Sequence, residues 1–256
     1  MYNKNLVVFF SILIIFTVCA CSINISGVPD IRINIVQVQG SGNVVSETRA
    51  VSGYKALNFS GLGDITIIQG NEEGLRIEAE DNILPNIVTE VKNDTLFIRF
   101  VPQGTTYIPS PGKSIRFDLK VKTLEDIQLS GAGKIEATKF EGTGLRVNIS
   151  GAGNIKMDGL SVNDLSTSLS GAGNLDLSGK ADRQDINLSG IGNYNAEKLE
   201  SAEVKVNVSG AGNAKVWATQ SLHVTISGAG SVRYAGNPRL TQQISGAGQV
   251  KSLESK

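Results

Sequence analysis

Two carboxylates of this sequence could do acid–base chemistry, and each stands a fixed number of residues before a cation. Asp126 precedes Arg146 by 20 residues, and Asp185 precedes Lys205 by 20. A polysaccharide-cleaving enzyme needs such groups clustered, one to donate a proton and one to act as base or nucleophile. The single histidine, His223, cannot form a histidine-based catalytic or zinc site alone. We predict no catalytic residue, and a carbohydrate-active enzyme using Asp126 or Asp185 is the alternative.

Cofactor chemistry has no motif here. Many Gly-x-Gly segments occur, but none continues as Gly-x-Gly-x-x-Gly, and none carries the Lys-Ser/Thr of a P-loop. Calcium-binding β-rolls repeat nine residues with an aspartate, whereas the residue after the last glycine is chiefly asparagine here. Both cysteines lie near the N-terminus, which leaves none in the remaining chain for a metal site or disulfide. We therefore predict no cofactor and no metal.

Composition excludes further classes. The chain has 256 residues, with 24 Lys and Arg against 24 Asp and Glu, and the cations form no run. A nucleic-acid binder needs clustered cations to displace phosphate counterions, so we expect no nucleic-acid partner. Hydrophobic residues make up 40 % and aromatic residues only 5 %. This is a globular composition with few rings for an aromatic cleft.

The N-terminus predicts export. Leu6 to Val18 is a run of 13 residues that is apolar except for a serine and a threonine, and Lys4 precedes it. As a helix it would span about 20 Å, short of the roughly 30 Å of a bilayer core. We interpret residues 1–20 as a signal peptide.

The run ends in Val18-Cys19-Ala20-Cys21, which is similar to a bacterial lipobox. Acylation of Cys21 would anchor the protein to a membrane without a spanning helix. Ordinary cleavage after Ala20, without a lipid, is the alternative. We expect residues 21–52 to be the lipidated N-terminus and a tether, and the protein to be a lipoprotein of the cell envelope, at the periplasmic or surface side of the outer membrane.

The candidate carboxylates and cations named above lie within a repeat of 18 to 20 residues. Ser-Gly-Ala-Gly or a near copy starts at Ser130, Ser150, Ser170, Ser189, Ser209, Ser227 and Ser245. An earlier, degenerate copy is Ser60-Gly61-Leu62-Gly63. Residues one and three places before each serine are mostly aliphatic, as in Leu129 and Ile127, and the residue between them is polar. This period of two predicts a strand with one buried face on each side of a tight corner.

Short strands of this kind cannot bury their apolar faces alone, so successive copies must stack. We predict an all-β fold, a single-stranded parallel β-helix with coils of about 20 residues. About ten such coils would fit between residues 54 and 250, with Lys55 to Val101 as irregular first coils of one continuous helix. The alanine of each corner can point into the narrow edge of the core. The structural corner glycines are Gly131, Gly133, Gly151, Gly153, Gly171, Gly173, Gly190, Gly192, Gly210, Gly212, Gly228, Gly230, Gly246 and Gly248.

Two outward columns could meet a partner. The polar residues just before the corners can form a hydrogen-bonded ladder or a binding strip for a sugar. The strip is Gln128, Asn148, Ser168, Asn187, Asn207, Thr225 and Gln243. After the corners, a charged column contains Glu136, Lys156, Asp176, Asn195, Lys215, Arg233 and Lys251. Taken together with the column that contains Asp126, Arg146, Asp185 and Lys205, opposite signs stand in adjacent repeats more often than like signs do, which indicates a solvated face. Trp217 is the one aromatic residue expected to point outward.

From residue 51 to residue 250 the sequence resembles the auto-transporter adhesins with a head GIN domain, from bacterial envelopes. The resemblance rests on the opening Tyr54 to Gly70, on Thr95-Leu96-Phe97-Ile98 and on the repeated Ser-Gly-Ala-Gly-Asn corners. It implies a head GIN domain over residues 53–256, right-handed and similar in fold to pectin lyases but without their catalytic residues.

We expect a non-enzymatic envelope lipoprotein, bound to a membrane through its lipid, whose β-helix surface binds a glycan or protein partner in adhesion. Besides the enzyme, an accessory or sensor subunit of an envelope system is an alternative.

Overall fold

The structure, a computed structural model, describes residues 35–100 and 106–253, which are built from strands and one 3-10 turn. The described residues from Ile35 onward belong to one unit. The predicted signal peptide and Cys21 lie outside them. The prediction of an all-β solenoid is confirmed.

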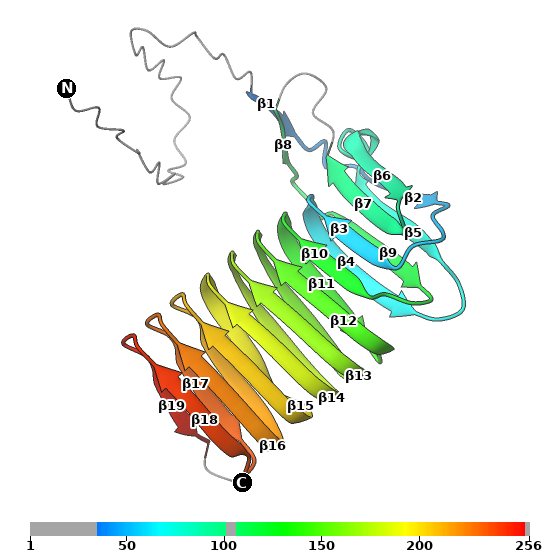
Figure 1. The fold of residues 1–256 in the computed structure, drawn as a ribbon. Helices are drawn as coiled ribbons and strands as arrows, with labels where there is room; N and C mark the ends of the chain where they lie inside the picture. The colour runs from blue at the N-terminus through cyan, green and yellow to red at the C-terminus, as the bar shows by residue number, and fades with distance from the viewer. Residues whose placement is uncertain (1–34, 101–105, 254–256) are drawn as a thin grey trace, which may run out of the picture. The chain divides into compact units, whose positions relative to one another are not determined.

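The repeat forms ten strands that coil upon one another (Figure 1). They are β10 (Asp126–Leu129), β11 (Ala132–Thr138), β12 (Glu141–Ile149), β13 (Ala152–Leu169), β14 (Ala172–Leu188), β15 (Ile191–Val208), β16 (Asn213–Ile226), β17 (Ser231–Ala235), β18 (Arg239–Ile244) and β19 (Gln249–Ser252). Pairing between coils is parallel and joins equivalent residues, for example Asn154 with Asn174 and Asn187 with Asn207. The repeat length therefore equals the length of one coil.

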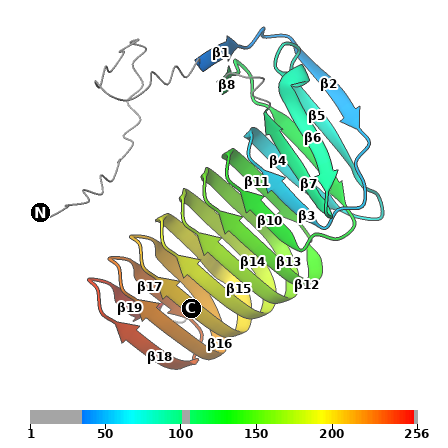
Figure 2. The same cartoon turned by 45° about the horizontal axis from the view of Figure 1, so that its top comes forward.

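The corners of successive coils line up along one side (Figure 2). The amide of Ala172 donates to the carbonyl of Gly151 in the preceding coil, at 3.1 Å. A Cβ added at Gly171 would lie 2.1 Å from that same oxygen, which no side chain allows. Glycine is thus required because two backbones meet there. Ala172 is exposed and points away from the core, so the expectation that the corner alanines point inward is wrong.

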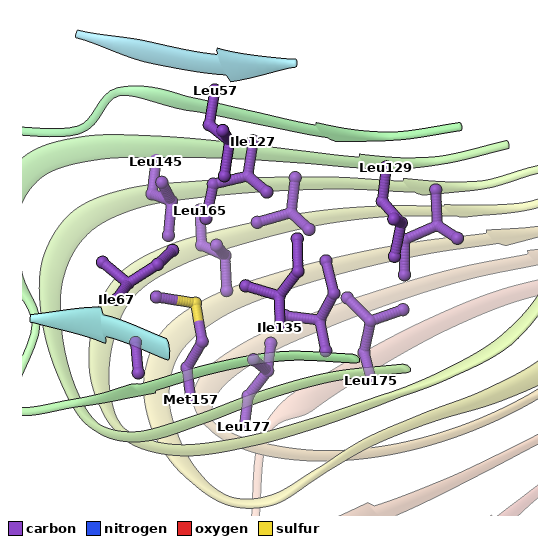
Figure 3. Packing of buried hydrophobic residues seen from close by; sticks show 14 of the residues in the cluster. Leu57, Ile67, Ile127, Leu129, Ile135, Leu145, Met157, Leu165, Leu175 and Leu177 are labelled. Atoms are coloured by element: carbon purple, nitrogen blue, oxygen red, sulfur yellow. The ribbon is translucent and has the colours of Figure 1, made fainter. Parts of the chain in front are cut away.

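Aliphatic ladders fill the inside of the solenoid. Figure 3 shows Ile127, Leu129 and Ile135 with Leu175 and Leu177 in this core, all of them buried. The strict alternation before the corners therefore corresponds to inward and outward side chains, as predicted. The ladders end at the last coil, where Ile244 is 39 % exposed because no further coil covers it.

The solenoid has about six turns, fewer than the ten predicted. The degenerate corner does belong to it: β3 (Ala56–Phe59) and β4 (Leu62–Gln69) pair in parallel with β10 and β11. The chain then leaves the stack. The other side of this first coil is covered by β7 (Thr95–Phe100) on β3 and by β9 (Arg116–Val121) on β4. The first coil is thus inside the sheet rather than at its end.

Strands β5 (Gly74–Glu80) and β6 (Ile87–Lys92) do not stack in parallel on the first coil, which corrects the prediction of irregular coils for this part of residues 55–101. Strand β5 is antiparallel to β9 and to β2 (Val44–Arg49), and β6 is antiparallel to β7. Asn93 and Asp94, with φ of 49° and 57°, form the turn between β6 and β7. Two residues of positive φ suit a tight hairpin, and this favours antiparallel pairing over a coil.

Three smaller elements complete the N-terminal part. Strand β1 (Ile35–Gln39) is parallel to β8 (Thr106–Ser110), and the 3-10 turn η1 (Leu84–Asn86) precedes β6. Glu80 is 1 % exposed and accepts hydrogen bonds from the amides of Gly42 at 2.7 Å and Gly112 at 2.9 Å. A buried carboxylate needs such donors. Glu80 therefore fastens two loops to the cap formed by β2 and β5.

Candidate functional site

The pre-corner face is the outer surface formed by the outward residues two, four and six places before each corner serine. Parallel pairing places these residues in three columns that run from coil to coil. The column next to the corners is the predicted strip, and its members stand in register from Gln128 to Gln243. Asn207 donates to the side-chain oxygen of Asn187 at 2.9 Å, and Asn58 donates to Gln128 at 3.0 Å. Part of the strip is thus a ladder, and every member remains at least partly accessible.

The other two columns carry charge in pairs. Arg183 binds Asp164 with two hydrogen bonds of 2.6 and 2.9 Å. This bidentate contact lowers the pKa of the Asp164 carboxyl below its ordinary value. The candidate catalytic carboxylates are also paired: Asp126 lies 3.0 Å from Arg146, and Asp185 lies 3.8 Å from Lys205.

A shallow groove of about 720 Å³ follows these two columns. It is lined, among others, by Arg146, Asp164, Arg183, Asp185, Lys205 and His223. His223 is an exposed residue of this lining. The groove therefore presents alternating charges over several coils, an arrangement that can bind a polar surface or an extended polymer.

The post-corner face is the outer surface formed by the outward residues that follow each corner. There the asparagines form a longer ladder than the strip does. Asn174 donates to Asn154 at 2.9 Å, Asn193 to Asn174 at 2.9 Å, and Asn213 to Asn193 at 3.3 Å. Ser231 extends the ladder, donating to Asn213 at 2.7 Å. Sequence reasoning noted this column without assigning it a role, although Asn after Gly in successive repeats was the signal that could have identified it.

Trp217 lies in β16 on the post-corner face, two residues after Lys215, and is half-buried. Tyr194 is buried, and Tyr234 packs partly buried against the core. The exposed aromatic surface is therefore small.

Within residues 35–100 and 106–253, no group of three or more His, Cys, Asp or Glu side chains is arranged to hold a metal ion. No helix of the described chain has the length and apolarity to cross a membrane.

Three solved structures share this fold. A putative adhesin from Bacteroides fragilis has a TM-score of 0.80 at 24 % identity, covering 84 % of this chain and 100 % of its own. A protein named as a putative lipid binding protein, from Parabacteroides distasonis, has a TM-score of 0.70 at 23 % identity, covering 86 % and 100 %. A putative adhesin from Parabacteroides merdae has a TM-score of 0.64 at 23 % identity, covering 85 % and 99 %.

None of the curated proteins matches this chain. A family model described as "Putative auto-transporter adhesin, head GIN domain" matches residues 53–238. The match begins just before β3, in the first coil of the solenoid, and ends just before β18, so it includes β5 of the cap and the repeat as far as β17. The chain therefore belongs to the auto-transporter adhesin, head GIN domain family, as the sequence resemblance indicated.

Proposed function

We propose that this protein is a lipid-anchored, non-enzymatic protein of the cell envelope that binds a polymer or protein partner through the pre-corner face. The observation that carries the proposal is the groove of about 720 Å³ beside the strip, because it presents charged and polar side chains of both signs over several coils. A repeated, rigid surface suits an extended partner. The family description and the adhesin names of two similar structures support a binding role.

The pairing of charges also favours binding over catalysis. A general acid or base needs a pKa shifted toward the working pH, which usually requires concentrated charge or burial in a cleft. The Asp126 and Asp185 carboxylates instead face cations, at 3.0 and 3.8 Å. The Asp185–Lys205 pair is exposed, and in the other pair Arg146 is exposed while the Asp126 side chain is 14 % exposed. In neither pair are reactive groups of like charge concentrated.

The remaining parts of the proposal come from the sequence. Acylation of Cys21 would attach the protein to the envelope membrane, with residues 21–52 as the lipidated segment and tether. The parallel pairing from β10 to β19 supports a parallel β-helix. A right-handed coil similar to pectin lyases is what the family resemblance implies, and it is part of this proposal.

The test uses the full chain in non-ionic detergent, incubated with isolated bacterial envelope fractions. We expect saturable retention that falls in Asn187→Ala/Asn207→Ala, which removes a ladder pair from the strip. The matched control is Asn154→Ala/Asn174→Ala, a ladder pair on the post-corner face, and it should retain binding. Equal retention of both variants would contradict the assignment of the pre-corner face.

The same fractions also test the enzymatic alternative. We expect no new reducing ends or unsaturated sugars when the chain is incubated with envelope polysaccharides. Reproducible cleavage that is lost in Asp126→Asn or Asp185→Asn would replace the binding function with a carbohydrate-active one.

A further inference from the structure

We propose that the post-corner face carries a second site, in its last coils, which binds an acidic polysaccharide through Lys215, Arg233 and Lys251. Lys215 in β16 pairs with Arg233 in β17, and Arg233 pairs with Lys251 in β19. Neighbouring strands lie about 4.8 Å apart, so three cations project from adjacent coils on one face. This cation column is separate from the pre-corner face and its groove.

Cations nearer to the N-terminal part of the same face are neutralised. Lys134 lies 2.6 Å from Glu136, and Lys156 lies 3.0 Å from Asp158. In the charged column itself, the signs alternate only in its first coils, from Glu136 through Lys156 to Asp176.

The cation column is compensated only at Lys215, as far as the described residues show. Lys215 has one carboxylate partner, Glu197, at 3.7 Å. Within residues 35–100 and 106–253, neither Arg233 nor Lys251 makes an ion pair, and both are exposed. Like charges directly opposite one another on adjacent strands destabilise a sheet. The chain as a whole has no net charge, so the column is a local concentration of positive charge. An anionic ligand would relieve the repulsion between its cations.

The surroundings favour a sugar polymer as the source of the negative charge. Trp217 stands two residues after Lys215 on the same face and is half-buried, with an apolar ring and a polar N–H edge. Beside the cations, the column Asn213, Ser231 and Gln249 offers amide and hydroxyl groups to sugar hydroxyls. A groove of about 630 Å³ along the asparagine ladder ends at Asn213 and Lys215 and so leads to this site.

Two nearby acidic residues limit the site on the N-terminal side of the cation column. Glu200 pairs with Trp217 from the preceding coil, and Glu197 is the partner of Lys215. Both lie on the N-terminal side of the cation column, where they would repel an anion. A polyuronate has one carboxylate on each sugar, so a segment lying along the solenoid axis can place successive carboxylates over one cation per coil.

The experiment titrates the full chain, in non-ionic detergent at low salt, with polygalacturonate. Trp217 is the single tryptophan of the sequence, so its fluorescence reports on this site. We expect a saturable change that weakens as salt is added. Lys215→Gln/Arg233→Gln/Lys251→Gln should bind about tenfold more weakly and Arg233→Gln about threefold, the scale of exposed charge contacts. Lys134→Gln/Lys156→Gln, which removes two paired cations from the same face, should stay within about twofold.

Folding provides a second readout. The thermal midpoint of the triple variant should not fall, since the replacement removes like-charge repulsion. Dextran sulfate should bind as polygalacturonate does, and neutral dextran should not. The proposal is overturned if neither acidic polymer binds, if the triple variant binds as the wild type does, or if neutral dextran binds equally. Binding to phosphatidylglycerol vesicles but not to either polymer would also overturn it, in favour of a lipid headgroup.

This second site belongs to the same binding function, and the experiments distinguish a failure of the second site from a failure of the pre-corner face. If the triple variant loses polygalacturonate binding while envelope retention still depends on Asn187 and Asn207, both sites stand. If polygalacturonate binding is independent of the three cations but retention behaves as expected, the second site alone is wrong.

Discussion

The phenol of Tyr194 donates a 2.6 Å hydrogen bond to the side-chain oxygen of Gln184 inside the solenoid. Gln184 in turn donates to the hydroxyl of Ser201 at 2.6 Å, and all three residues are buried. Burial raises the pKa of the Tyr194 phenol well above its ordinary value, so the group stays a neutral donor. This short chain of hydrogen bonds joins adjacent coils from inside.

Replacing Tyr194 by Phe should destabilise the fold by about 1–3 kcal/mol, because the buried Gln184 oxygen loses its donor. Urea unfolding followed by circular dichroism measures the change. The double variant Tyr194→Phe/Gln184→Leu removes the unpaired group and should cost less than the sum of the two single changes. Additive effects would mean that the hydrogen bond does not couple the two residues.

The two faces of a repeat strand should respond differently to the same new charge. Val147 is 0 % exposed, so Val147→Asp buries an unpaired carboxylate and should cost several kcal/mol, of the order of 3–5. Asn148→Asp, one residue later on the outer face, should cost less than about 1 kcal/mol. Thermal unfolding compares the two variants, and equal shifts would contradict the assignment of the faces.

Gly171→Ala should destabilise the solenoid by about 1–3 kcal/mol, because the added Cβ would lie 2.1 Å from the carbonyl oxygen of Gly151 and force the coils apart. Ala172→Ser is the matched control at the next residue, which is exposed and should change stability by less than about 0.5 kcal/mol. Guanidinium unfolding midpoints test the pair. A neutral Gly171→Ala would show that the coils need not approach so closely.

We expect the fold to lose stability at alkaline pH, because the phenol of Tyr54 is buried. This phenol donates to the carbonyl of Lys120 at 2.6 Å, and burial raises its pKa to about 12 from 10.0. The folded state therefore binds this proton more tightly than the unfolded state does. The resulting contribution is complete below pH 10 and is lost as the pH rises from 10 toward 12. Denaturant midpoints measured between these pH values should decline less steeply in Tyr54→Phe; identical slopes would show that Tyr54 is not the group responsible.

Cys21 should carry a diacylglycerol when the chain is made in a bacterial host. Mass spectrometry of the mature N-terminus measures the modification, and globomycin should block processing. Cys21→Ser should abolish membrane attachment, whereas Cys19→Ser should not, because Cys19 would leave with the signal peptide. An unmodified Cys21 in the mature protein would refute the anchor.

The repeat half of this fold could be predicted because its information is local. Alternation of aliphatic and polar residues before each corner assigns Val147 inward and Asn148 outward without reference to any other coil. Equal spacing of the copies then makes equivalent residues neighbours, so the strip was placed in register from the sequence. The outward direction of the corner alanines could not be predicted in this way. Glycine and alanine are both small enough for a narrow turn, so their size does not decide which way the alanine points.

The candidate sites depended more on contacts between distant segments. Gln184 occupies a position that alternation places inside, but only the packed core shows Tyr194 and Ser201 as its partners. From the sequence, the alternating charges predicted that the whole post-corner face is a solvated surface of paired charges. The structure shows ion pairs only in its first coils and at Lys215, and it leaves Arg233 and Lys251 unpaired among the described residues.

By itself, the sequence determined the all-β class, the length of each coil and the inner and outer faces, because strand period and glycine corners act within one repeat. The tertiary structure alone decided how the solenoid is capped. The pairing of β3 with both β7 and β10 brings together segments that are far apart in the chain. No local pattern encodes that choice, since backbone hydrogen bonding between strands is the same for any partner and the packing of the whole cap selects one.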